Sequence, residues 1–178
     1  VSDTGVLDYA FEVTLVNSGS DLPTYAQPTT NSNNSDTIKA GTTGLKITNA
    51  AVADGLIWVK AHWTVKETDK DGKTKVIAKS GWATYSNFNL VPTKFTVVSD
   101  SLNIRKDAGS GNEFVFKLTK GVEVEVHEIK LVGEEIWGKI VGYTPTTGSD
   151  IENYDGWINL ASNYVKRSSK IAIDGGTK

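Results

Sequence analysis

Apolar and polar residues alternate with a period of two along much of the chain. From Val122 to His127, each valine is followed by a glutamate or, at the end, by the histidine. This is the period of a β-strand, whose successive side chains point to opposite faces of a sheet. The segment from Trp58 to Val65 is also rich in β-branched and aromatic residues, which favour strands. The pattern predicts an all-β protein in which helices are scarce.

Clusters of Gly, Pro, Asn, Asp and Ser predict the turns between these strands. The Asp71-Gly72 pair is a strong signal for a β-hairpin with a two-residue turn. The stretch from Pro23 to Asp36 has two prolines and a centre rich in Asn, Ser and Thr, so we expect a long exposed loop there. Residues 108–112 are expected to form a shorter counterpart, and residues 143–155 a polar loop.

Five short motifs occur twice, in the same order. The matching pairs are Ile38-Lys39-Ala40-Gly41 with Leu118-Thr119-Lys120-Gly121, Leu45 and Ile47 with Val124 and Val126, Ile57-Trp58 with Ile136-Trp137, Gly81-Trp82 with Gly156-Trp157, and Ser86-Asn87-Phe88 with Ser162-Asn163-Tyr164. The spacing between partners is 80, 79, 75 or 76 residues, a drift that small changes in loop length explain. The chain therefore contains an internal repeat.

The boundary between the two copies falls near Pro92, because a proline interrupts strand pairing and the pattern restarts at Phe95. This predicts one domain over residues 1–92 and a second over residues 93–166. Residues 167–178 are expected to form a flexible C-terminal tail. The chain does not begin with methionine, so we expect that it follows a removed segment or is a piece of something longer.

Composition narrows the possible functions. The net charge is −2 and there is no basic patch, which disfavours a nucleic-acid partner because binding requires Lys and Arg to neutralise phosphates. The chain has no cysteine, so a disulfide or a thiolate metal site is excluded. No run of 18 apolar residues occurs, which predicts that no segment of this chain spans a membrane.

The residues that nucleophilic catalysis requires are scarce. The only histidines are His62 and His127, and no Gly-x-Ser-x-Gly motif accompanies them. His127 lies among Glu123, Glu125 and Glu128, a set that could bind a cation. The alternation of this strand already explains the cluster as a solvated face, since metal ligands must converge on one point. We expect no enzymatic activity, no metal site and no cofactor.

Four blocks of the second copy carry a family pattern and cover nearly all of residues 97–165. They are Leu102-Asn103-Ile104-Arg105-Lys106-Asp107-Ala108-Gly109, Leu118-Thr119-Lys120-Gly121, Ile136-Trp137-Gly138-Lys139-Ile140, and Gly156-Trp157-Ile158 followed by Tyr164-Val165. Their order and spacing closely resemble bacterial SH3 domains. The family favours a small residue and a Gly-Pro turn after the Arg position, where this chain has residues 106–108. The first copy resembles a degenerate member, because Pro23 and Tyr25 replace the Asn and Arg.

The resemblance implies a fold of two tandem small SH3-like β-barrels. Such modules accompany bacterial cell-wall hydrolases and phage lysins, which implies an extracellular or cell-wall associated protein. The implied function is non-catalytic attachment of a larger secreted protein to the cell wall, with a peptidoglycan peptide or another wall polymer as partner. The alternative is an interaction or scaffolding module that packs on a neighbouring catalytic domain of the same polypeptide. The degenerate first copy favours the alternative for that copy.

The second copy holds the candidate ligand-binding residues. They are Asn103, Arg105, Trp137, Tyr143, Tyr154, Trp157 and Tyr164. Aromatic rings on a β scaffold are suited to pack on a peptide or a sugar. The Asn and Arg could hydrogen-bond a peptide backbone or a carboxylate. Two alternatives stay open: at least one of the two tryptophans belongs to the core, and Arg105 could instead form an ion pair with Asp107 or Glu113.

Overall fold

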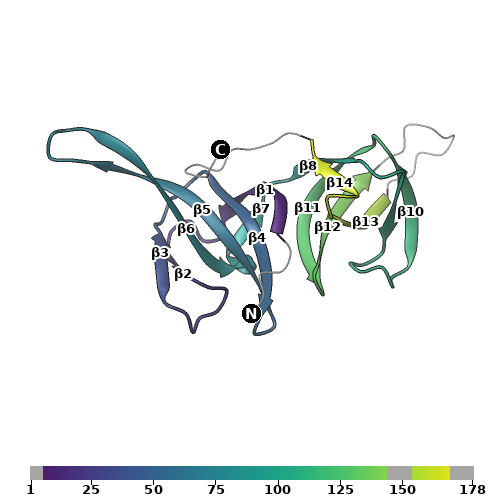
Figure 1. Ribbon diagram of the computed structural model, residues 1–178, viewed down its shortest axis with the longest axis horizontal. Helices are drawn as coiled ribbons and strands as arrows, with labels where there is room; N and C mark the ends of the chain where they lie inside the picture. The colour runs from purple at the N-terminus through teal and green to yellow at the C-terminus, as the bar shows by residue number, and fades with distance from the viewer. Residues whose placement is uncertain (1–5, 144–153, 169–178) are drawn as a thin grey trace. The chain divides into compact units, whose positions relative to one another are not determined.

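The computed structural model describes residues 6–143 and 154–168, and it describes side chains over 11–141 and 154–168 (Figure 1). The described residues form strands joined by turns and include no α-helix. The strands are β1 (Val6–Leu15), β2 (Leu22–Tyr25), β3 (Asn34–Ile38), β4 (Leu45–Ala53), β5 (Leu56–Thr68), β6 (Thr74–Thr84), β7 (Phe88–Leu90), β8 (Thr93–Val97), β9 (Ser101–Arg105), β10 (Phe114–Thr119), β11 (Glu123–Val132), β12 (Glu135–Tyr143), β13 (Tyr154–Asn159) and β14 (Val165–Arg167). A 3-10 turn, η1 (Tyr85–Asn87), precedes β7.

The chain divides into two compact units between Val91 and Pro92. Each unit is one curled antiparallel sheet of seven strands. The strand order is β3-β2-β6-β5-β4-β1-β7 in unit one and β10-β9-β13-β12-β11-β8-β14 in unit two. Adding seven to each strand number converts the first order into the second. The predicted all-β class, with two small barrel-like sheets, is therefore confirmed.

The two units also share the register of their strands. In unit one Trp58 is paired with Thr84, and in unit two Trp137 is paired with Asn159. The pairing register shifts at the same point in both units. In β4 the shift follows Ile47, and in β11 it follows Val126, the counterpart of Ile47. The repeat seen in the sequence thus extends to individual backbone pairs.

Alternation along the strands builds the core of each unit. In unit one the fully buried side chains include Phe11, Ile47 and Val59, and in unit two they include Ile104 and Ile158. Burial of each such side chain contributes roughly 1.5–3 kcal/mol relative to exposure. The polar residues between them point outward, as the period of two requires.

Each unit buries a tryptophan on the outward face of the sheet. Trp58 alternates with the core residue Val59 and therefore lies on the opposite face of β5, yet only 2% of it is exposed. It packs with Ala51, Ala53 and Trp82 in a small separate cluster, with Tyr25 against it. The counterpart Trp137 is 3% exposed. The tryptophan of each Ile-Trp motif is therefore a structural residue, and Trp137 is in addition a candidate ligand-binding residue.

A glycine before a tryptophan lets one strand approach another closely in each unit. A Cβ atom on Gly81 would overlap the side chain of Thr24. A Cβ atom on Gly156 would lie 2.5 Å from the carbonyl oxygen of Arg105 and 2.6 Å from Cγ2 of Ile104. The Gly-Trp motif recurs because β2 and β9 cross β6 and β13 at the same place, where only glycine fits.

The prediction of one long loop and one short counterpart is wrong. The ends of the stretch from Pro23 to Asp36 belong to β2 and β3, which pair with each other, and Thr24 donates its hydroxyl hydrogen bond to the carbonyl oxygen of Asp36. What remains, residues 26–33, is as long as the loop over residues 106–113. In each loop the backbone amide of the first residue donates to the carbonyl oxygen of the last, Ala26 to Asn33 and Lys106 to Glu113, both at 2.9 Å.

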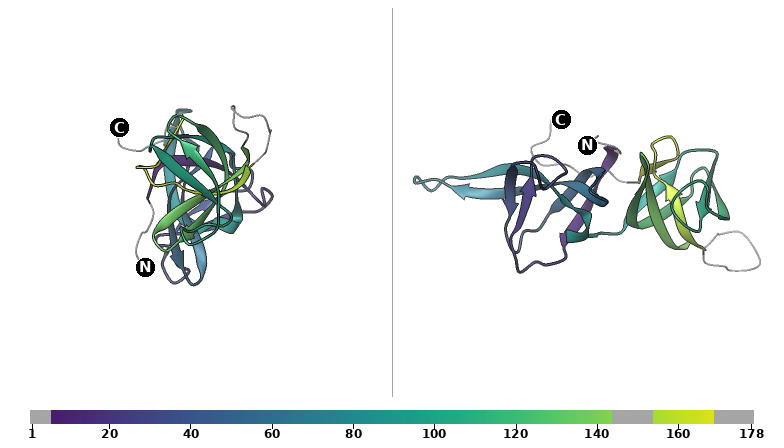
Figure 2. Two further views of the ribbon diagram at one scale, coloured as in Figure 1. Left: turned by 90° about the vertical axis from the view of Figure 1, so that its right-hand side faces the viewer. Right: turned by 90° about the horizontal axis from the view of Figure 1, so that it is seen from below.

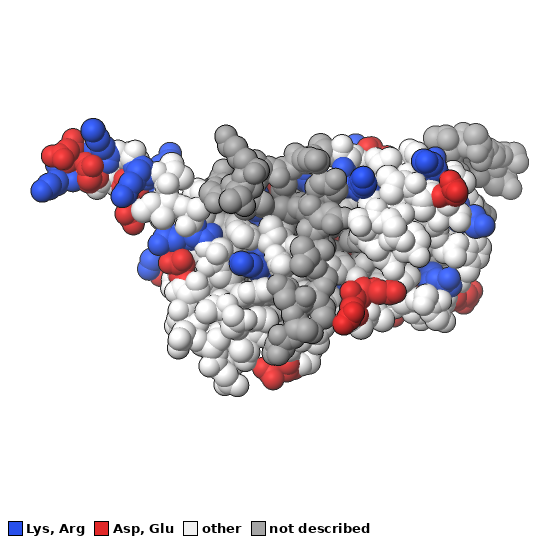
Figure 3. All heavy atoms as spheres, in the orientation of Figure 1, with Lys and Arg blue, Asp and Glu red and all other residues white. Residues whose placement is uncertain are grey.

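The predicted hairpin at Asp71-Gly72 is present, with a longer turn. β5 and β6 pair from Trp58 to Thr68, so the hairpin projects beyond the rest of unit one (Figure 2). Asp69 donates its backbone amide to the carbonyl oxygen of Lys73 at 2.9 Å, which leaves a three-residue turn with Gly72 at φ 79°. The Oδ1 atom of Asp69 accepts two more amides at 2.9 Å and stabilises this turn. Lysines and acidic residues gather around the tip (Figure 3).

One correspondence in the repeat needs correction. Phe88 pairs with Leu15, whereas in unit two Val165 pairs with Val97, so the counterpart of Phe88 is Val165 and not Tyr164. The turn before β14 is longer than the turn before β7, which conceals this shift in the sequence.

Strands include both ends of the expected polar loop over residues 143–155 and the first residue of the expected tail. Tyr143 closes β12, and Tyr154 and Asp155 open β13. Arg167, expected to begin the tail, pairs with Phe95. Residues 144–153 and 169–178 lie outside the described residues.

Candidate functional site

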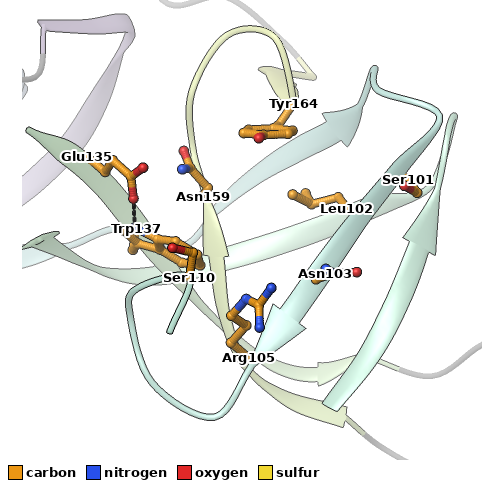
Figure 4. A pocket seen from close by; sticks show the side chains of 9 residues that line it. All are labelled: Ser101, Leu102, Asn103, Arg105, Ser110, Glu135, Trp137, Asn159 and Tyr164. Carbon is orange, nitrogen blue, oxygen red and sulfur yellow. Dashed lines mark hydrogen bonds between the residues drawn. The ribbon is translucent and has the colours of Figure 1, made fainter. Parts of the chain in front are cut away.

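Unit two contains a cleft of about 300 Å³ between β9, the loop after it, and the ends of β12 and β13 (Figure 4). Two aromatic residues line it together with polar and charged side chains. The lining residues are Ser101, Leu102, Asn103, Arg105, Ser110, Glu135, Trp137, Asn159 and Tyr164. Most of these side chains are polar or charged, so the cleft can hold a ligand chiefly through hydrogen bonds and ionic contacts.

Trp137 and Glu135 are held together on the same strand. They are two residues apart in β12, so their side chains lie on the same face, and the indole Nε1 donates a hydrogen bond to Oε2 of Glu135 at 2.9 Å. This bond satisfies the only donor of a nearly buried ring. It also fixes a carboxylate at the edge of the cleft, as Figure 4 shows.

Arg105 ties the loop over residues 106–113 to the sheet. Its Nη1 atom donates to the carbonyl oxygen of Asn112 at 2.8 Å. The two acids considered as its partners are paired elsewhere: Asp107 with Lys130 at 2.9 Å and Glu113 with Lys106 at 3.0 Å. A guanidinium has five N–H donors, so Arg105 retains donors for a ligand in the cleft.

The cleft therefore presents charges of both signs. Arg105 supplies a cation and Glu135 an anion, and the side-chain amide of Asn103 offers a donor and an acceptor. Asn159 offers the N–H groups of its amide, because its Oδ1 atom accepts from the Ala161 backbone amide at 2.9 Å. Such a set can hold a ligand that has both a carboxylate and an amine, or the alternating N–H and C=O groups of a peptide backbone.

The loop beside the cleft is fastened by a second interaction. The Lys130 ammonium donates to Asp107 at 2.9 Å, and the Ala108 backbone amide donates to the same carboxylate oxygen at 2.7 Å. These two hydrogen bonds, the lysine first, hold the pKa of Asp107 below its ordinary value. Lys130 also lies 5.0 Å from the ring centre of Trp157, a cation–π distance.

The structure brings four of the seven predicted ligand-binding residues into this cleft: Asn103, Arg105, Trp137 and Tyr164. Two others lie elsewhere among the described residues. Trp157 lies beneath Lys130, and the ring of Tyr154 stacks on Phe116 at 4.4 Å between centroids. The seventh, Tyr143, ends β12 at the edge of the described chain, and its side chain lies outside the described residues.

Sequence reasoning missed several lining residues, chiefly Glu135, Asn159 and Ser110. Two of them had a readable signal. Glu135 stands two positions before a tryptophan in a strand pattern, and Asn159 stands two positions after another, so each shares a face with an aromatic ring. Only the pairing of Trp137 with Asn159 shows that these two faces meet.

The acidic cluster around His127 does not converge. Its Nε2 atom lies 3.1 Å from Oε1 of Glu125, whereas Glu128 pairs with Lys139 at 3.4 Å. Across the described residues, no group of three or more His, Asp or Glu side chains is arranged to hold a metal ion. In that same part of the chain, no helix is long and apolar enough to cross a membrane.

No protein-family model and no curated protein matches this chain.

Proposed function

We propose that this chain is a non-catalytic binding module that attaches a larger secreted bacterial protein to the cell wall. In this proposal the chain is a pair of bacterial SH3 domains, and the cleft of unit two binds the peptide portion of peptidoglycan. One observation carries the proposal. Residues from three separate blocks of the family pattern, Arg105, Trp137 and Tyr164, line one cleft although they are far apart in the sequence.

The charges of the cleft match the chemistry of wall peptides. These peptides carry free carboxylates and amino groups along a short backbone. Arg105 can bind a carboxylate through its remaining donors, and Glu135 can bind an ammonium. The half-buried Tyr164 provides an aromatic surface against which a peptide can pack, whereas the nearly buried Trp137 offers little exposed surface. Each contact is weak, and display of the module beside a second unit raises the effective affinity for a polymer.

The test is retention of the purified chain on washed, insoluble cell walls. Binding at low salt is expected, with release by a soluble wall peptide. Arg105→Ala should lower retention about tenfold or more, since a hydrogen bond to a charged group contributes roughly 1.5–3 kcal/mol. Lys106→Ala is the matched control, because this neighbouring cation pairs with Glu113 outside the cleft.

Three results would contradict the proposal. The chain could pass through the walls unretained at low salt, the two variants could lose retention equally, or a soluble wall peptide could leave the bound chain in place. Circular dichroism of both variants separates loss of the ligand contact from loss of the fold.

A further inference from the structure

Unit one contains a second cleft, of about 200 Å³. It lies at the end of β2, under the loop over residues 26–33. The lining residues are Leu22, Pro23, Tyr25, Thr30, Trp58, Ala83, Thr84 and Asn87. None of the candidate ligand-binding residues named from the sequence lies in this cleft, because all of them belong to the second copy.

The two clefts occupy equivalent places in the two sheets. Backbone pairing and the equal loops match seven lining residues of one cleft with seven of the other: Leu22 with Leu102, Pro23 with Asn103, Tyr25 with Arg105, Thr30 with Ser110, Trp58 with Trp137, Thr84 with Asn159, and Asn87 with Tyr164. The last match follows from one hydrogen bond in each unit. The carbonyl oxygen of Asn87 accepts from Val16 at 3.0 Å, and that of Tyr164 accepts from Val98 at 2.8 Å.

The unit-one cleft lacks both of the charged side chains that line the unit-two cleft. Tyr25 stands where unit two has Arg105, and Leu56 stands where unit two has Glu135. Without that carboxylate, Trp58 donates its Nε1 hydrogen to the backbone oxygen of Ala53 at 3.3 Å. None of the described residues that line the cleft is charged. An ionic ligand would therefore lose hydration there without gaining a counter-charge.

The remaining groups form an aromatic surface with short polar side chains around it. The half-buried Tyr25 ring stands edge-on to Trp58, with 5.8 Å between centroids and 81° between planes. Pro23 extends the apolar wall, while Thr30 and Thr84 bring hydroxyl groups. The described hydrogen bonds of the Asn87 side chain both use its amide nitrogen, which donates to Thr84 at 2.7 and 3.2 Å. Its amide oxygen stays an acceptor for a ligand.

We propose that the unit-one cleft binds an uncharged sugar ring. A pyranose has an apolar C–H face that packs on an aromatic ring and a rim of hydroxyl groups that pair with hydroxyl and amide side chains. Tyr25 contacts the face of the sugar, and Thr30, Thr84 and Asn87 bind its hydroxyl groups. The two units then differ in ligand class, a charged peptide for unit two and a neutral saccharide for unit one. This assignment does not require that unit two binds a wall peptide.

The experiment is a titration of the full chain with a neutral oligomer of N-acetylglucosamine, followed by amide NMR shifts. Shifts are expected at residues around the unit-one cleft, with a dissociation constant of about a millimolar, as for small contacts of this kind. Tyr25→Ala should weaken binding about tenfold, and Tyr25→Phe should preserve most of it, because the ring supplies the packing surface. Thr30→Ala, at an exposed loop position, should weaken binding without disturbing the fold.

Controls separate this site from the one in unit two. Arg105→Ala should leave the sugar titration unchanged, and the de-acetylated, positively charged oligomer should bind the unit-one cleft at least about tenfold more weakly. The proposal is overturned if the neutral oligomer shifts the amide signals of unit two instead, or if both oligomers bind unit one equally. It is also overturned if a soluble wall peptide and not the sugar shifts the amide signals of Thr84 and Asn87, or if these signals do not shift at all. A failure of wall-peptide binding in unit two leaves these outcomes unaffected.

Discussion

Tyr25 and Arg105 occupy the same place in the two units. Each is the register partner of the tryptophan that follows a glycine, Trp82 for Tyr25 and Trp157 for Arg105. The tyrosine ring packs into the outward apolar cluster of unit one, whereas the arginine reaches the loop beside it through Asn112. One substitution on a shared backbone therefore changes both the chemistry of the cleft and the way its loop is held.

The first prediction concerns that loop. Arg105→Ala removes the hydrogen bond from Nη1 to the carbonyl oxygen of Asn112, which should cost about 1 kcal/mol of local stability. Amide hydrogen exchange should speed up at Lys106, whose backbone amide bonds to the carbonyl oxygen of Glu113 across the loop. The unit-one loop serves as the internal control, since its exchange should not change. Equal exchange in the variant and the parent would show that the arginine does not fasten the loop.

The second prediction concerns the two glycines at the strand crossings. Gly81→Ala and Gly156→Ala should each destabilise their own unit by about 3 kcal/mol, at the upper end of the cost of overpacking, because the added Cβ meets a neighbouring strand. Urea unfolding followed by tryptophan fluorescence measures the loss. Gly111→Ala is the control, since a Cβ there meets no atom within 4 Å. Unfolding midpoints that match the control would refute the steric argument.

The third prediction concerns the carboxylate of Asp107. Its pKa lies below the ordinary 3.8 because Lys130 and then the Ala108 amide donate to it. A depressed folded-state pKa means that the pair stabilises the chain above about pH 3.8, and that this contribution is lost as the pH falls through the folded-state pKa. Lys130→Met should move the pKa of Asp107 back toward 3.8, as carboxyl carbon NMR would measure.

Asp21 provides a matched reference for that titration. Its pKa is also lowered, by the Ala40 amide and by Lys39, and it belongs to the other unit. Lys130→Met should leave the titration of Asp21 in place. If both carboxylates moved together, the change would reflect a global effect and the local account of Asp107 would fail.

The fourth prediction concerns His62. Burial, and then the charge of Lys60, lower its pKa below 6.5, while Thr48 lies 2.8 Å from its Nε2 atom. Between the folded-state pKa and 6.5, the unfolded chain binds a proton that the folded chain does not, so the free energy of unfolding falls as the pH drops below about 6.5. His62→Gln should reduce this fall. Lys60→Met should reduce it partly, and an imidazole titration at 6.5 or above would contradict the prediction.

Much of the fold was readable from the sequence. The valines of β11 gave the period of two, and the repeated Ile-Trp and Gly-Trp pairs located the counterparts in the two units. These signals are local, because a strand places alternate residues on opposite faces and a close strand crossing requires glycine. The shift that pairs Phe88 with Val165 was not readable, since a longer turn conceals it and only the hydrogen bonds to β1 and β8 reveal it.

The candidate site was readable in part. Asn103, Arg105, Trp137 and Tyr164 were named from the sequence, whereas Glu135 and Asn159 were not. The first set belongs to a family pattern. The second shares strand faces with tryptophans in the sequence, but only the cross-strand pairing shows that these faces meet. The separation of Tyr154 from this cleft was equally hidden, because its contact with Phe116 comes from a strand elsewhere in the sequence.

By itself, the sequence determined that this protein is a duplicated β-sheet module and that Val124 and Val126 of β11 face its core. The tertiary structure alone decided that Trp58 and Trp137 are buried on outward faces, that the two loops are equal in length, and that Tyr25 replaces Arg105 at the same point of a second cleft. The physical reason is that alternation along a strand follows from neighbouring residues. Contacts between strands and the return of a loop over a sheet depend on register, which forms only when the whole sheet folds.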